Sequence, residues 1–210
     1  FEGSDLTAID SVSGINGTIV GATRVASGVP NFGNALFFKG PGDGLFEYMQ
    51  VNDPTLFKGR TEYTVSFIAK TPGTNGPNSI LSLATSATSA NDLLLNMSGA
   101  STDTLWISGS AKSGVSLLPF TDDKWHRYTL RRDGTKVDLI VDNVLVGTVS
   151  TSSTANSGTS LAIGEEQDCA PGCMDDTQSF KGMFDDLQIW DRSITDDESA
   201  TLPLPVYGPF

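Results

Sequence analysis

Short stretches of alternating apolar and polar residues recur along the chain, and glycine, asparagine, aspartate or proline separates most of them. A period of two is that of a strand with one buried face, and the separating residues are those of tight turns. Strands are therefore predicted at 35–38, 63–69, 79–83, 93–97, 104–108, 125–131, 137–141, 144–149 and 182–190. This pattern restricts the fold more than any other feature.

Only one helix is predicted, near the end of the chain. Thr195 and Glu198 have the spacing of a capping box, acidic residues fill the first turn, and Pro203 ends the helix. Tight turns at 133–134 and 142–143 join successive strands into a meander. The prediction is an all-β fold, a two-sheet antiparallel jelly-roll sandwich with one short C-terminal helix.

The chain has 210 residues, of which 38% are hydrophobic, enough for one sandwich with a full core. No repeat or linker divides it, and the low-complexity stretch 150–160 fits a surface loop, so a single domain over residues 1–210 is expected. The abrupt start at Phe1 suggests a mature protein or an excised domain. No apolar run reaches the roughly 18 residues that span a bilayer.

The net charge is −12. Such a charge repels phosphate backbones and argues against nucleic-acid binding. An acidic surplus can serve solubility, a saline habitat, or cation binding by clustered carboxylates. The spacing of the acids decides among these, and the segment 164–180 is where they cluster.

The segment 164–180 contains five carboxylates and two amides, and Pro171 and Gly172 fold it back on itself. Calcium in proteins binds roughly six to eight oxygens from carboxylates, amides, backbone carbonyls and water. A solvated acidic loop is the alternative interpretation. The mixture of carboxylates with amides and turn residues raises the case for calcium.

The spacing within this segment indicates two arms. Glu166 and Asp168, two positions apart, can aim at one ion, while Gln167 presents its backbone carbonyl between them. On the returning arm, Asp175 and Gln178 lie three positions apart and could close a second site.

The two cysteines, Cys169 and Cys173, lie in the same segment. They could form a short disulfide, supply half of a metal site, or remain free thiols. A zinc site needs about four ligands, and the only histidine, His126, is distant in sequence. A disulfide is favoured; it would join the two arms and indicate an oxidising compartment.

The segment resembles the calcium loop of the pentraxins, in which Gly-Gln-Glu-Gln-Asp is followed by a glycine-rich turn, an acid and Gln-Ser. The match needs no gap and falls on Glu166, Gln167, Asp168, Asp175 and Gln178. The resemblance implies two calcium ions bridged by Glu166 and Asp168, with the carbonyl of Gln167 as a ligand and the later pair on the second ion.

The pentraxins take further calcium ligands from an Asp-Asn pair in an earlier loop. Residues 80–85 are similar to the strand before that loop, and Asn91 and Asp92 follow with the order of the pair inverted. The resemblance therefore implies Asn91 and Asp92 as additional ligands.

A looser similarity to laminin-G-like domains, which include the pentraxins, covers most of the chain through 34–38, 63–67, 124–126 and 184–190. The core His-x-Cys-x-Ser/Thr-Trp signature of true pentraxins and their stapling cysteine pair are missing. The resemblance thus carries over the jelly roll and the calcium loop, and it does not carry over a ring-shaped pentamer.

These observations predict an extracellular, calcium-dependent, lectin-like domain that binds glycans or phosphate-bearing headgroups, with no nucleic acid and no transmembrane segment. An extracellular adhesion module with a protein partner is the alternative. A jelly-roll glycan hydrolase or lyase is a third possibility; Glu166 and Asp168 begin its Glu-x-Asp-x-x-Glu pattern, but Pro171 stands at the last position. The chain is not expected to be an enzyme.

Aromatic and histidine side chains have plainer interpretations. Trp125 and Trp190 are expected in the core, while Trp106 fits either the core or a platform for a sugar ring. His126 has no adjacent nucleophile pattern and is expected to be structural or at the surface.

Overall fold

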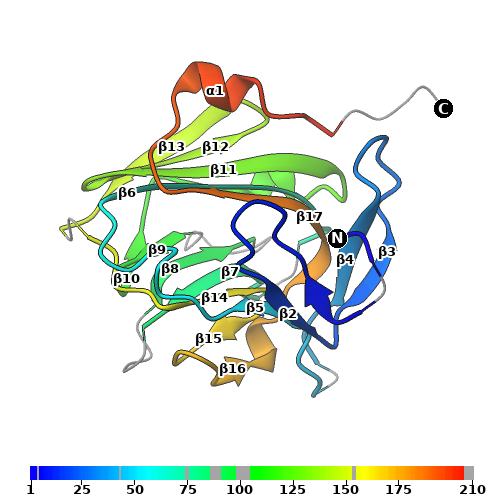
Figure 1. Cartoon of the computed structure of the whole chain (residues 1–210). Helices are drawn as coiled ribbons and strands as arrows, with labels where there is room; N and C mark the ends of the chain where they lie inside the picture. The colour runs from blue at the N-terminus through cyan, green and yellow to red at the C-terminus, as the bar shows by residue number, and fades with distance from the viewer. Residues whose placement is uncertain are drawn as a thin grey trace.

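Inward side chains of two antiparallel sheets meet to form the core (Figure 1). The computed structural model describes residues 1–3, 5–42, 44–73, 76–85, 91–97, 105–152 and 155–205. Phe67 illustrates the packing: its ring stacks on those of Tyr128 and Phe184, with centroids 5.4 and 5.0 Å apart. Leu81 and Leu83 of the opposite sheet belong to the same buried cluster.

One sheet has eight strands. Their order across the sheet is β1 (Thr7–Ala8), β2 (Gly17–Val20), β5 (Tyr48–Val51), β14 (Ser160–Ile163), β7 (Ser79–Ala84), β8 (Asn91–Asn96), β9 (Leu105–Ile107) and β10 (Ser110–Lys112). Because β14 lies between β5 and β7, the middle of the sheet brings together residues that are far apart in the sequence.

The other sheet has seven strands. Their order is β13 (Val144–Ser150), β12 (Lys136–Val141), β11 (Trp125–Asp133), β6 (Glu62–Lys70), β17 (Lys181–Trp190), β4 (Asn34–Lys39) and β3 (Thr23–Ala26). The predicted meander is its β11–β12–β13 part, joined by antiparallel pairs.

The remaining elements are short. They are β15 (Glu166–Gln167) and β16 (Met174–Asp175), which pair with each other, the 3₁₀ turns η1 (Leu118–Phe120) and η2 (Asp176–Gln178), and the helix α1 (Asp196–Ala200). This architecture confirms the predicted fold class. No helix in the described ranges has the length and apolar character needed to cross a membrane.

The C-terminal segment, defined here as residues 191–205, covers the outer face of the seven-stranded sheet, with α1 above it (Figure 1). Its contact with β6 runs through Thr64, whose hydroxyl donates to the carbonyl of Arg192 and accepts from the amide of Ile194. The predicted capping box is present: the Thr195 hydroxyl accepts from the Glu198 amide at 3.2 Å, and the Glu198 carboxylate accepts from the Thr195 amide at 2.8 Å.

The sequence analysis did not predict β2, β3, β5 and β14, each of which has four residues. Each has too few residues for a period of two to stand out. The prediction at 93–97 is shifted, since β8 begins at Asn91, and Thr104 of the prediction at 104–108 lies outside the described residues.

The tryptophans divide between different environments. Trp125 is buried, and its indole N–H donates to the carbonyl of Ser27. The prediction that Trp190 lies in the core is wrong. It pairs with Thr64 and so shares the outer face of the seven-stranded sheet, where it is half-buried. Trp106 is also half-buried, opposite Leu94 in the eight-stranded sheet.

Candidate metal centre

The β15–β16 hairpin lies against the eight-stranded sheet, at the opposite end of the molecule from α1 (Figure 1). Two hydrogen bonds attach it to β7 and the residue after it: the Gln167 amide donates to the Ser82 hydroxyl at 3.1 Å, and the Ala170 amide donates to the Thr85 carbonyl at 3.1 Å. The segment predicted as a loop thus contains a small sheet of its own.

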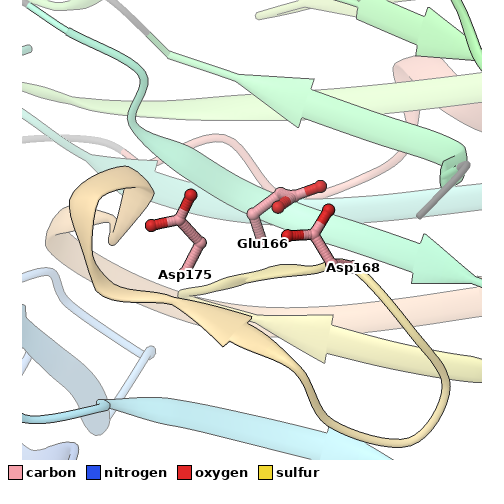
Figure 2. A group of neighbouring side chains, drawn as sticks. All are labelled: Glu166, Asp168 and Asp175. Carbon is pink, nitrogen blue, oxygen red and sulfur yellow. The ribbon is translucent and has the colours of Figure 1, made fainter.

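The register of the hairpin brings the acids together. Glu166 pairs with Asp175, and the two side chains therefore point to the same side. Asp168 follows Glu166 by two positions, and its amide donates to the Cys173 carbonyl at 3.0 Å. One carboxylate oxygen from each of Glu166, Asp168 and Asp175 lies within 4.8 Å of the others. Figure 2 shows the three side chains on one side of the hairpin.

These three carboxylates, hereafter the acid cluster, have no ion pair with a basic side chain anywhere in the described part of the chain. Two like charges 4 Å apart near a protein surface repel by about 4 kcal/mol. The arrangement therefore costs free energy unless positive charge reaches it.

Two side-chain amides direct the partial positive charge of their N–H groups at the acid cluster. The Asn91 side chain donates through Nδ2 to Glu166, and its Oδ1 accepts from the Ser82 hydroxyl at 2.7 Å. The Gln178 side chain donates through Nε2 to Glu166 at 3.3 Å and to Asp175 at 3.0 Å. Both predicted amide residues thus border the acid cluster, with their N–H groups directed at its oxygens.

Two carboxyls of the acid cluster have pKa values shifted in opposite directions. Burial, followed by the charges of Asp168 and Asp175, raises the pKa of Glu166 to about 7. Hydrogen bonds from Thr177 and Gln178 lower the pKa of Asp175. Glu166 therefore keeps a proton at a pH where Asp175 is ionised.

Glu165, next to the acid cluster in sequence, faces a different set of groups. It is fully buried, and its Oε1 accepts from the Ser179 hydroxyl at 2.7 Å and from the Glu47 amide at 3.2 Å. Burial is the main reason that its pKa rises to about 7.

Asp92 is the predicted ligand that the structure does not bring to the acid cluster. The β7–β8 register shifts at this point, so that Asn91 pairs with Ala84 and Asp92 is the extra residue of a bulge. Bulges redirect side chains. The Asp92 carboxylate accepts from the backbone amides of Ser157 and Gly158, the latter at 3.0 Å.

A disulfide joins Cys169 to Cys173, as favoured from the sequence. It spans the turn between the two arms of the hairpin, directly after Asp168 and shortly before Asp175. The covalent bond and the β15–β16 pairing together limit how far the two arms can separate.

His126 belongs to another part of the molecule. Its Nδ1 lies 2.6 Å from Asp142 and its Nε2 lies 3.0 Å from Asp122. Ionised carboxylates only accept hydrogen bonds, so this geometry suits a ring that donates from both nitrogens. The histidine links the loop before β11 to the β12–β13 turn.

The fold and the hairpin define a laminin-G-like jelly roll with an acidic surface loop. A family model for the concanavalin A-like lectin/glucanases superfamily matches residues 43–199, and the chain belongs to this family. No curated protein sequence matches the chain.

Solved structures show the same fold. The chain is similar to a heptameric SAP-like pentraxin from Limulus polyphemus, with 20% identity, a TM-score of 0.63, and coverage of 79% of each chain. Domain 4 of AbnA, an extracellular GH43 arabinanase from Geobacillus stearothermophilus, in complex with arabinotriose, has 18% identity, a TM-score of 0.67, and coverage of 92% of this chain and 91% of that one.

A third similar structure is a Trypanosoma rangeli sialidase, with 14% identity and a TM-score of 0.68. The match covers 96% of this chain but 31% of the sialidase, so it involves a part of that enzyme. At these identities, the three structures establish the fold, and the similarity to pentraxin and laminin-G-like domains is confirmed at that level.

Proposed function

We propose that this domain recognises an extracellular ligand through calcium held by the acid cluster. The observation that carries the proposal is the convergence of Glu166, Asp168 and Asp175 within 4.8 Å, with no basic partner in the described residues. Buried charges are usually paired with an opposite charge, and the buried Glu166 has amides and two further carboxylates beside it instead.

The donor set fits calcium, which prefers hard oxygens in a flexible arrangement. The ligands would be the three carboxylates, the backbone carbonyl of Gln167, and the amide oxygens of Asn91 and Gln178. A half-turn of either terminal amide exchanges its N–H₂ for its oxygen. For Asn91, the Ser82 hydroxyl can then accept instead of donate. We propose two ions for this set and leave Asp92 out, because backbone amides engage its carboxylate.

The ligand class follows from charge. A protein of net charge −12 attracts an anion only where cations invert the local field. Calcium with open coordination positions would bind vicinal hydroxyls or carboxylates of glycans, or a phosphate monoester. The arabinanase domain solved with arabinotriose, which shares this fold, supports the glycan option.

Recognition is favoured over hydrolysis by the residues of the hairpin. A jelly-roll glycosidase with a Glu-x-Asp-x-x-Glu strand needs a carboxyl at the last position to act across the scissile bond. Here that position is Pro171, after Glu166 and Asp168. The disulfide supports an extracellular location, since such bonds persist in oxidising compartments.

A thermal melt tests the calcium site. Calcium that binds only the folded state should raise the melting temperature. At a hundredfold excess of calcium over Kd, the free energy of unfolding should increase by about 2.7 kcal/mol. We expect the Asp168→Asn substitution to remove the difference between calcium and chelator. Asp123→Asn, the same change at an exposed aspartate outside the acid cluster, should preserve it. An identical melt of the wild-type protein in calcium and chelator would overturn the proposal.

A glycan and phospholipid-headgroup array, probed with and without chelator, tests the ligand class. Calcium-dependent binding to either set supports the lectin-like function. Binding to neither, in a protein that does bind calcium, would favour a protein partner. Release of reducing sugar from an array glycan would favour an enzyme.

A further inference from the structure

The side chain of Gln167 is unlike its neighbours in the hairpin because it points away from the acid cluster. Glu166 and Asp168, on either side of it, face the cluster, and strand alternation turns Gln167 toward the eight-stranded sheet. Its exposed fraction is 0%. Sequence reasoning gave this residue a role only for its backbone carbonyl.

The Gln167 side-chain amide is hydrogen-bonded on both sides. Nε2 donates both of its hydrogens, to the carbonyls of Ser82 and Ser160, each at 3.0 Å. Oε1 accepts from the side-chain amide of Gln50 at 3.1 Å. The Ser160 hydroxyl lies at the same distance from Oε1, but its single hydrogen is closer to Asn52 Oδ1, 2.6 Å away. The partners come from β7, β14 and β5, three adjacent strands of the sheet.

The backbone of Gln167 extends this contact to the acid cluster. Its amide donates to the Ser82 hydroxyl, which donates in turn to Asn91, and Asn91 donates to Glu166. Gln167 therefore attaches its arm of the hairpin to the sheet, and it also holds the Ser82 hydroxyl that orients the Asn91 amide.

We infer that Gln167 is the positioning residue of the metal centre, holding Glu166 and Asp168 at ligand spacing before an ion arrives. The inference rests on the proposed calcium function. Its physical basis is the mutual repulsion of the acid cluster, which favours separation of the arms. β15 has only two residues, and the disulfide joins the two arms to each other without attaching them to the sheet. The Gln167 amide adds that attachment through three strands, and preorganised ligands bind more tightly.

The residue type matters as much as the position. A glutamate at 167 could not donate to the two carbonyls and would add negative charge beside the acid cluster. A methionine has a similar length but none of the hydrogen bonds. Gln167→Met therefore removes the constraint while retaining the volume, which makes it the informative variant.

Calcium titration of chelator-treated protein by calorimetry tests the inference. We expect Gln167→Met to weaken calcium binding about 10–100-fold, the usual effect of removing a group that orients metal ligands. Gln188→Met is the matched control. Gln188 is a glutamine of β17 in the seven-stranded sheet, where its side chain donates to Asp186 of the same strand. Its calcium affinity should stay within about twofold of wild type.

A second measurement separates positioning from general stability. Terbium bound in place of calcium reports, through its luminescence decay in H₂O and D₂O, how many waters it coordinates. A misplaced arm loses a protein oxygen and gains water, so Gln167→Met should increase the water count while Gln188→Met should not. A global loss of stability would not change the count in the folded fraction.

The outcomes are distinguishable. If wild-type protein binds no calcium, the proposed function fails, and this inference fails with it. If wild-type protein binds calcium and Gln167→Met has the same affinity and water count, only the inference is overturned. Should Gln167→Met not fold, Gln50→Met removes one of the three residues that bond the Gln167 side chain. A severalfold weaker affinity would support the inference, and an unchanged affinity would overturn it.

Discussion

Each sheet has one segment packed against its outer face: the C-terminal segment on the seven-stranded sheet and the β15–β16 hairpin on the eight-stranded sheet. The charges at these two contacts are arranged in opposite ways. On the seven-stranded sheet, cations and anions alternate. Arg127 is fully buried against Asp186, and Arg131 contacts Asp138 at 2.9 Å and Asp196 at 2.6 Å. These pairs join strands of the sheet to one another, and they join the sheet to the C-terminal segment.

On the eight-stranded sheet, the hairpin collects acids alone. The acid cluster is held by a disulfide, by strand pairing and by the amide of Gln167, with no cation from the described residues. Paired charges stabilise the fold, whereas like charges held together against their repulsion support the proposed cation site. The same substitution should therefore have opposite consequences on the two faces.

The largest effect is expected for Asp186→Asn. It leaves Arg127 buried without an anion, and removing one partner of a buried pair costs about 3–5 kcal/mol. Asparagine tolerates the left-handed backbone of this position, where φ is 49°, so the change isolates the charge. Urea denaturation in chelator measures the loss. A loss under about 1 kcal/mol would contradict a stabilising role for the pair.

The double substitution Cys169→Ser and Cys173→Ser should follow in size. A cross-link closing so short a loop contributes about 2 kcal/mol in the chain-entropy description. We also expect weaker calcium binding, because the arms would no longer be joined. Denaturation with and without calcium measures both effects. An unchanged calcium affinity would show that strand pairing and Gln167 are sufficient.

Asp168→Asn should have a smaller effect of the opposite sign. Measured in chelator, the stability of this variant should equal or exceed that of wild type by up to about 1 kcal/mol, because a screened like charge is removed from the acid cluster. The variant should lose its response to calcium. A destabilisation as large as that of Asp186→Asn would remove the contrast between the two faces.

The smallest effect concerns His126, a paired charge on the other side of β11 from Arg127, where its ring contacts Tyr128 and bonds Asp142 and Asp122. Burial acts against the charged ring, yet the two hydrogen bonds raise the pKa of His126 above its ordinary value. A raised folded-state pKa gives stability that is complete below the unfolded value of about 6.5 and is lost as pH rises through the folded value.

Denaturation of wild type and His126→Gln across pH tests this sign. The stability advantage of wild type should be under about 1 kcal/mol after solvent screening, present at acidic pH, and absent at alkaline pH. Because His126 is the only histidine, its imidazole resonances give the pKa directly. A pKa below about 6.5 would contradict the charged link.

The sequence was most informative where its signals are local. Alternation within 63–69 and 182–190 predicted β6 and β17, and the capping-box spacing predicted α1. The contiguous motif from Glu166 to Gln178 predicted both arms of the hairpin. Signals that span few residues, such as those of β2 and β14, were lost because two alternations do not stand out from chance.

Non-local features could not be predicted. The partners of the Gln167 side chain lie 85 and 117 residues away at Ser82 and Gln50, and no spacing rule connects them. The bulge that redirects Asp92 depends on the pairing of β7 with β8, which the sequence does not specify. The resemblance pointed to Asn91 and Asp92 together, but the register of β7 and β8 decides that only Asn91 faces the hairpin.

The two amides at the acid cluster have a consequence for how the domain would behave as calcium rises and falls. Asn91 and Gln178 direct N–H groups at the carboxylates, and a half-turn of each amide offers an oxygen instead. Under the proposed function, the same two side chains would therefore offset part of the carboxylate repulsion without calcium and act as ligands with it.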